Sequence, residues 1–452
     1  MISNRKEKLK WNFVAFLLIT GAAYMIINLS PSLLALNLPD SDSYLSPSAV
    51  RTAIYPSFIN FFELVEIDVI NLQILILSLS ISSLCISLFH IKINKFLVLI
   101  FFLTICLNIY YSSFSKTFLP ESIFFSCINF FFSLQLLKNK KSIHFLFLGL
   151  LLGLILTIKK IGIVIVGIFI LLFIYERCND KKFKKNFLII ISSIILIFAL
   201  ENFLFFKDHN KRGSVLVHTV IGKLFIISGN ENFNSNNYDP KYKQILKYSG
   251  KYFGEVNNFL DSADNIFLKA ELLSDYETIA QYRFLKLENV KNFHITINHH
   301  FRKDMNKILF NMLKYNYKDL LELSLYHYLG MWSVGSKQIF LTDNLLIPPH
   351  FENLKEASCC VGKINNNLLK LVNKLFILLM YLSIFSMLFF FIQKSNIKTM
   401  VISCFIVSQL YLIAVSFVNL ATLRYLMPVY PIIILQIVLI VDHMYKKFRK
   451  NL

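Results

Sequence analysis

Long apolar runs dominate this sequence and constrain its fold more than any other feature. Ten runs come near the length of about 20 residues that a helix needs to cross a bilayer, although the third, fifth and sixth are short. Apolar residues make up 56% of the chain and charged residues only 16%, whereas soluble proteins carry about 25% charged residues. We therefore predict an all-α polytopic membrane protein with about ten transmembrane helices, at 11–30, 69–90, 96–112, 121–137, 143–158, 161–175, 187–206, 368–392, 399–418 and 425–443.

The distribution of Lys and Arg predicts the orientation of these spans. One set of connecting segments carries 20 Lys and Arg residues, and the opposite set of short loops carries 5. Basic segments stay on the cytoplasmic side, so both termini are predicted to be cytoplasmic. The first run lacks a small-residue cleavage site, which favours a retained anchor. The basic set comprises 1–10, 91–95, 138–142, 176–186, 393–398 and 446–450, and the opposite set comprises 37–66, 113–120, 159–160 and 419–424.

This orientation places a large polar segment, between spans seven and eight, outside the membrane. The segment has few strand signals and is predicted to be mainly helical. Its stretches 271–290 and 311–332 are typical of amphipathic helices, and we expect the second at the membrane surface, with Trp332 at the headgroup level. The predicted parts are an N-terminal membrane module at 1–206 with catalytic outer loops, the extracytoplasmic segment 207–364 and a C-terminal membrane module at 365–452.

The outer loop after the first span carries two carboxylates beside a membrane boundary. Asp40 and Asp42 are separated by one serine and are followed by Tyr44, Arg51 and Tyr55. Pro, Ser and Asp favour a solvated turn, and taken alone this turn is the better explanation of the two acids. The arginine and the aromatic run that follow favour a built site.

Two further outer features carry charge at span ends. Glu121 follows Pro120, a pattern that also suits an ordinary helix start. Lys159 and Lys160 separate two very apolar spans. They are explained either by lysines that extend to the interface or by binding of an anionic lipid phosphate.

The last span opens with an arginine at the outer interface. Arg424 and Tyr425 precede Pro428 and Pro431, and a proline inside a span removes a helix hydrogen bond that the surroundings must replace. An interface anchor on a kinked helix is one interpretation. Phosphate recognition is favoured, because a guanidinium binds phosphate through two parallel hydrogen bonds.

No metal or disulfide framework is evident. The seven cysteines show no ligand spacing, and the scattered acids do not define a metal site. We predict no cofactor, although Glu121 could support a divalent metal ion.

Together, these motifs resemble the C-type superfamily of integral-membrane glycosyltransferases. The resemblance rests on PDSDSY with its following arginine and YPS, then LPES, TIKK and RYLMPVYP, in that order along the chain. The resemblance covers the membrane core. Within the superfamily, the chain resembles the bacterial branch related to protein mannosyltransferases and lipid A aminoarabinose transferases. Two departures are Lys-Lys-Ile where relatives often have Arg-Pro, and a serine between the two acids of the first loop.

The resemblance implies a reaction and a location. It implies transfer of a hexose or pentose from a polyprenyl-phosphate donor to a glycan, lipid or protein acceptor of the cell envelope. Transfer would occur on the outer face of a bacterial cytoplasmic membrane, with inversion and without nucleic acid. The implied catalytic residues are Asp40, which is the first choice as base, Asp42 and Glu121; the implied donor-phosphate ligands are Arg424, Tyr425, Lys159 and Lys160; and the implied acceptor or loop supports are Tyr44, Arg51 and Tyr55.

Two alternatives remain open. A polysaccharide polymerase or O-antigen ligase also combines many spans with a large outer loop. A lipid-linked oligosaccharide flippase or another transporter should place polar residues near the bilayer midplane. Most acids and bases here lie at span ends, with Asn108, Gln409 and Gln436 as polar exceptions.

Overall fold

The structure is a computed structural model in which every regular element is a helix within the described residues. Those residues are 2–32, 34, 36, 41–45, 48, 51–137, 141–177, 182–209, 212, 216–261, 265–287, 300–333, 366–392, 398–418 and 422–451. Asp40 therefore lies outside the described residues.

The chain divides into two compact units. Unit 1 comprises Met1–Asn210, Tyr381–Tyr411 and Met427–Leu452, and unit 2 comprises Lys211–Met380 and Leu412–Leu426. The predicted division at residues 206 and 365 stays a prediction. The helices that belong to unit 1 are α1 (Ile2–Leu29), α2 (Asp42–Leu45), α3 (Ile54–Leu64), α4 (Val69–His90), α5 (Lys95–Cys106), α6 (Ile109–Phe114), α7 (Glu121–Leu136), α8 (Ser142–Ile158), α9 (Gly162–Arg177), α10 (Phe183–Asp208), η3 (Met427–Val429) and α22 (Tyr430–Asn451).

Unit 2 contains the polar central part of the chain. Its helices are α11 (Leu216–Ile227), η1 (Ser235–Asn237), η2 (Pro240–Tyr242), α12 (Lys243–Asp261), α13 (Ile266–Leu287), α15 (His300–Tyr315), α16 (Tyr317–Trp332) and α21 (Leu423–Leu426), whereas α19 (Asn366–Ile392) and α20 (Lys398–Val418) contribute residues to both units.

Six helices are long and apolar enough to cross a membrane. They lie at Trp11–Leu29, Val69–His90, Phe183–Asp208, Lys370–Met387, Lys398–Val418 and Leu423–Arg449, and α5, α7, α8 and α9 are shorter apolar helices. Only 17% of the apolar window of α1 and 22% of that of α10 are buried. Exposed apolar faces of this length are typical of helices that face lipid. The chain thus has the features of a polytopic membrane protein, and the count of ten spans and their orientation stay predictions.

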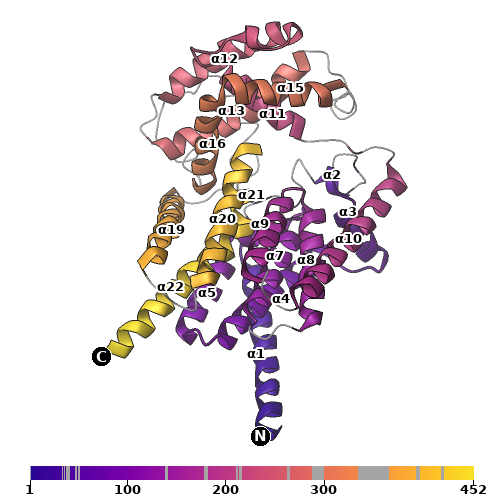
Figure 1. Cartoon of the computed structure of the whole chain (residues 1–452), viewed down its shortest axis with the longest axis vertical. Coiled ribbons are helices and arrows are strands. Elements are labelled where there is room, and N and C mark those ends of the chain that lie inside the picture. Colours follow the sequence, from indigo (N-terminus) through magenta and orange to yellow (C-terminus); the bar gives the residue numbers. More distant parts are fainter. Residues whose placement is uncertain are drawn as a thin grey trace. The chain divides into compact units, whose positions relative to one another are not determined.

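Unit 1 is built from apolar helices packed side by side. Helix α8 packs along α10, α4 along α7, and α1 along α4 (Figure 1). Gly149 and Gly153 of α8 bring α8 and α10 close together, because a Cβ atom on either would lie within 2.7 Å of a Cβ atom of α10. Glycines four residues apart let membrane helices approach this closely.

The predicted third span, 96–112, is interrupted. Helix α5 ends at Cys106, and α6 begins at Ile109. The side chain of Asn108 accepts a hydrogen bond from the backbone N–H of Tyr111 at 3.0 Å. An asparagine that caps a new helix start in this way ends the preceding helix, so the expectation of one continuous helix is wrong.

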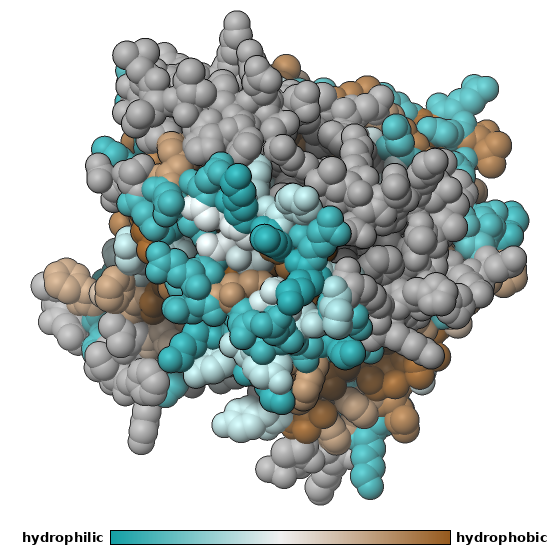
Figure 2. Space-filling model, turned by 90° about the horizontal axis from the view of Figure 1, so that it is seen from above, coloured by the Kyte–Doolittle hydropathy of each residue, from teal (hydrophilic) through white to brown (hydrophobic). Residues whose placement is uncertain are grey.

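Unit 2 encloses its own hydrophobic core, which α11, α12, α13, α15 and α16 supply. The stretch 311–332 is divided at Asn316 into the end of α15 and all of α16. Trp332 has no exposed surface, so its ring contacts protein and not lipid, and its level relative to the headgroups stays a prediction. Seen from above, the described residues present a broad hydrophilic area with hydrophobic side chains toward its margins (Figure 2).

Candidate functional site

A buried ion pair joins two of the predicted site residues. The ammonium nitrogen of Lys159 lies 2.9 Å from a carboxylate oxygen of Glu121, and the two side chains are 8% and 0% exposed. Glu121 opens α7, and Lys159 ends α8. The positive charge of Lys159 is therefore balanced by Glu121, and Lys159 is not one half of an exposed pair of cations.

In the loop after the first span, which the sequence predicts to lie outside, two tyrosine rings pack edge to face beside a cation. The guanidinium of Arg51 lies 4.6 Å from the centre of the Tyr44 ring, a favourable cation–π distance. Its Nε donates to the Ser43 hydroxyl at 3.0 Å. The rings of Tyr44 and Tyr55 meet edge to face with centroids 6.0 Å apart.

Tyr55 connects this aromatic pair to the ion pair of Glu121 and Lys159. Its hydroxyl donates to the Gln73 side-chain oxygen at 3.2 Å. The hydroxyl of Ser122 donates to the backbone oxygen of Gln73, also at 3.2 Å, and Ser122 is the neighbour of Glu121 along the chain. Burial first, and the charge of Glu121 second, raise the pKa of the Tyr55 hydroxyl. Tyr55 thus stays a neutral hydrogen-bond donor.

Two contacts hold the loop segment before Tyr55 against the membrane helices. The hydroxyl of Thr52 donates to the backbone oxygen of Ile158 at 3.1 Å. The carboxylate of Glu201 accepts the backbone N–H groups of Ala53 and Ile54, each at 3.0 Å. Helix α3 has no side-chain cap of its own, so Glu201 stabilises its positive end.

We call Tyr44, Arg51, Tyr55, Glu121 and Lys159 the outer-loop cluster. Its members come from three separate segments of the chain that the sequence had singled out. Sequence reasoning missed the roles of Gln73 and Glu201, although both are polar residues inside predicted spans, which is the signal that could have indicated them.

The other predicted residues are placed differently. Asp42 is the first residue of α2 and is exposed, and Lys160 is also exposed, in contrast to Lys159. Arg424 and Tyr425 are half-buried on α21, in unit 2.

A second buried polar network lies in unit 2, and sequence reasoning missed it entirely. His327 Nε2 lies 2.8 Å from a Glu277 carboxylate oxygen, and its Nδ1 lies 2.5 Å from the ammonium nitrogen of Lys223. Lys223 also donates to the backbone oxygen of Ser416 at 3.2 Å. Burial lowers the pKa of Lys223 to about 8, and burial together with the charge of Lys223 lowers the pKa of His327. A neutral imidazole therefore bridges an ammonium and a carboxylate.

Within the part of the chain that the structure describes, no three His, Cys, Asp or Glu side chains gather as a metal site would require. Comparison with protein-family models, with curated proteins and with solved structures gives no match for this chain.

Proposed function

We propose that this chain is a membrane glycosyltransferase that moves a sugar from a polyprenyl-phosphate donor to a cell-envelope acceptor. The observation that carries the proposal is the convergence of the outer-loop cluster. Arg51 lies over the ring of Tyr44, which packs edge to face on Tyr55. Tyr55 donates to Gln73, whose backbone oxygen accepts from Ser122 beside Glu121, and Glu121 pairs with Lys159. The resemblance in the sequence links these same segments to catalysis.

The proposed reaction is an inverting displacement with an aspartate base. Asp40, or Asp42 in its place, removes the proton of the acceptor hydroxyl or amine. The acceptor atom then bonds to the anomeric carbon, while the bond from that carbon to the phosphate oxygen breaks. The polyprenyl phosphate leaves with the electron pair, so positive charge at the phosphate matters more than a general acid.

The geometry of the cluster refines the proposed roles. Lys159 already has a carboxylate partner at 2.9 Å, so we assign the Glu121–Lys159 pair to positioning of the first loop. Donor-phosphate binding is then proposed for Arg424, with Tyr425 beside it and the exposed Lys160 as a second candidate.

The polar residues inside the spans give no specific support to a transporter. The side-chain nitrogen of Gln409 donates to the Ser383 hydroxyl at 2.8 Å, and that of Gln436 donates to the Ser383 backbone oxygen at 3.2 Å. Asn108 caps α6. These groups are used for contacts between helices or at a helix end, whereas a transport path requires polar groups that bind cargo. The polymerase or ligase alternative shares the membrane fold, so the two functions are distinguished by which lipid-linked donor the protein uses.

The test is a transfer assay in proteoliposomes with radiolabelled polyprenyl-phosphate sugars. Asp40→Asn keeps the side-chain shape but removes the base, so we expect a loss of at least ~100-fold in rate with normal membrane insertion. If Asp40→Asn is active and Asp42→Asn is inactive, the base is Asp42. Full activity of both variants would refute the first-loop assignment, and use of a diphosphate-linked oligosaccharide alone would favour the polymerase or ligase.

A further inference from the structure

Exposed basic side chains gather where the end of α22 meets the turn between α4 and α5. Lys92 lies in that turn and Lys95 begins α5, whereas Lys447 and Arg449 lie in the last turns of α22; all four are exposed. We call these four residues the basic surface. Within the described structure, none of them meets a carboxylate. Asp442 is the only acidic residue of α5, α22 and the turn, so positive charge is in strong excess here.

Polar contacts hold the two parts of the basic surface together. The buried carboxylate of Asp442 accepts the backbone N–H of Asn94 at 2.9 Å and lies 2.6 Å from the ammonium nitrogen of Lys446. The same ammonium donates to the backbone oxygen of Lys92 at 2.7 Å. Helix α5 also packs on α22 (Figure 1). Lys446 is therefore used to join the segments, and the four cations of the basic surface stand on a fixed framework.

Apolar side chains continue from the basic surface along both helices. Exposed apolar residues three and four positions apart form one face of each helix: Phe96, Leu99 and Leu103 of α5, and Val441, Met444 and Phe448 of α22. The face of α5 begins directly after Lys95. Cations beside an exposed apolar face match an amphiphile that has an anionic head and apolar chains.

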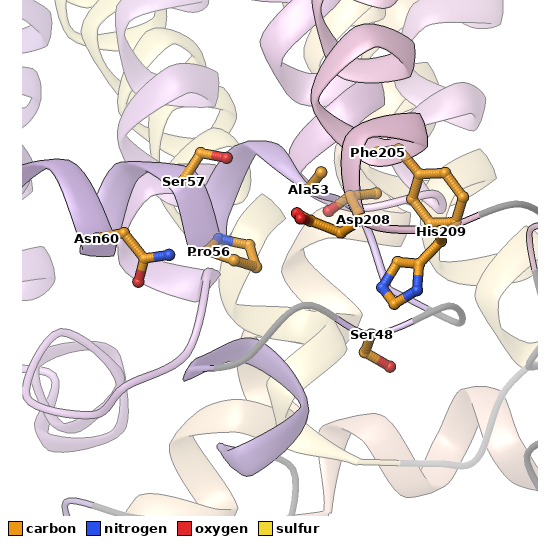
Figure 3. A pocket seen from close by; sticks show the side chains of 9 residues that line it. Ser48, Ala53, Pro56, Ser57, Asn60, Phe205, Asp208 and His209 are labelled. Carbon is orange, nitrogen blue, oxygen red and sulfur yellow. The ribbon is translucent and has the colours of Figure 1, made fainter.

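The cavity between the start of α3 and the end of α10 offers no comparable surface. Its volume of about 30 Å³ is about the share of one water molecule in the liquid. Figure 3 shows the side chains of Asp208 and His209 among those that line it, and none of the nine described lining residues is Lys or Arg. Size and charge both exclude an anionic headgroup from this cavity.

We propose that the basic surface binds the headgroup of an anionic phospholipid, whose acyl chains lie along the exposed apolar faces of α5 and α22. Basic residues at the end of a membrane helix attract anionic lipids, and each Lys contributes roughly fivefold to the affinity. Both segments belong to the basic set that the sequence predicts to be cytoplasmic, so the lipid would come from the cytoplasmic leaflet. No residue of the basic surface belongs to the outer-loop cluster, so the inference does not depend on the proposed function.

The test is photocrosslinking of the full chain in phosphatidylcholine nanodiscs that carry a small fraction of photoactivatable phosphatidylglycerol. Mass spectrometry of peptides locates the label, and photoactivatable phosphatidylcholine is the matched probe. We expect the anionic probe to label the peptides of 89–107 and 441–449 in preference to the matched probe. Unlabelled phosphatidylglycerol should compete, whereas soluble glycerol phosphate should not. Raising the salt from about 0.1 M to about 1 M should weaken the labelling, because the screening length falls from about 10 Å to about 3 Å.

Paired variants test the contribution of individual lysines. The double variant Lys95→Gln with Lys447→Gln should weaken binding of the anionic lipid roughly 25-fold, the product of about fivefold for each Lys. The matched control is Lys184→Gln with Lys185→Gln, the same change of charge at two exposed residues of α10. The control should leave the labelling of 89–107 and 441–449 unchanged.

Four results would overturn the inference. Equal labelling of these peptides by the two probes would show ordinary lipid contact without selection for charge. Equal losses in the two double variants would show a diffuse effect of net charge. Competition by glycerol phosphate as strong as that by the intact lipid would assign the basic surface to a soluble phosphate. Label confined to other peptides of the wild type would refute the location, and this readout decides the matter even where a variant fails to insert.

Discussion

Replacing Glu121 by Gln should destabilise unit 1 strongly at neutral pH and weakly at alkaline pH. Gln keeps the shape of the side chain but leaves the Lys159 ammonium, 8% exposed, without its counter-charge. Breaking a buried pair in this way costs about 3–5 kcal/mol. The unpaired ammonium can avoid this penalty by losing its proton. With the reference Lys pKa of about 10.4, deprotonation costs about 4.6 kcal/mol at pH 7 but only about 2 kcal/mol at pH 9.

Calorimetric unfolding in nanodiscs at pH 7 and pH 9 measures this difference. Unfolding midpoints move by ~2–4 °C per kcal/mol for domains of 150–250 residues. The unfolding midpoint of Glu121→Gln should therefore lie at least ~6 °C below that of wild type at pH 7. The matched control is Glu63→Gln, the same chemical change at an exposed residue of α3. Lys159→Met should also destabilise, because it leaves the buried Glu121 carboxylate without its cation.

The double variant Glu121→Gln with Lys159→Met decides whether the two residues act as a pair. Removing both charges should restore most of the lost stability, because an uncharged pair of similar volume carries no uncompensated buried charge. Additive losses, with a coupling energy below about 0.5 kcal/mol, would refute the pair. Equal destabilisation by Glu121→Gln at pH 7 and pH 9 would refute the argument from Lys deprotonation.

Three further predictions concern topology, donor binding and the network of unit 2. Cysteine introduced at the exposed Asn236 should be labelled by an impermeant reagent in intact spheroplasts; labelling only after lysis would reverse the predicted orientation. Arg424→Ala should weaken use of the lipid donor by ~1.5–3 kcal/mol, the range for a hydrogen bond to a charged group. Arg424→Lys should retain part of the donor use, and the dependence of the rate on donor concentration measures both effects. Because the pKa of Lys223 is about 8 in the fold and higher when unfolded, the unfolded state binds more protons between pH 8 and 10.5. The free energy of unfolding of the wild type should therefore rise by up to about 3 kcal/mol as the pH increases over that window. Calorimetry should show no such rise in Lys223→Met.

The apolar helices were predictable because their signal is local. Each run of apolar residues identifies a helix by composition and length, and all ten runs are helical over most of their length in the described residues. The break at Asn108 was less predictable. The residue lies in an otherwise apolar run, and only its bond to the Tyr111 N–H shows that it begins a new helix.

The candidate site was predictable in its members and not in its pairings. Glu121 and Lys159 were each singled out as charges at span ends, but they are 38 residues apart. Spacing along the chain cannot show that they neutralise each other. The network of Lys223, Glu277 and His327 gave no local signal, because each residue lies on a different helix of a polar segment where ionisable residues are common.

Glu201 shows that an ionisable residue inside an apolar span can position a neighbouring loop. It is 1% exposed on α10, where an unpaired carboxylate would be costly. It offsets that cost by accepting two backbone N–H groups at the start of α3, and the same bonds fix the loop end that leads to Tyr55. Tyr55 in turn reaches Gln73 on α4, whose backbone oxygen accepts from Ser122 beside Glu121. The geometry of the outer-loop cluster therefore depends on polar residues of three different apolar helices, so a change at Glu201 should displace the cluster while every member is still present.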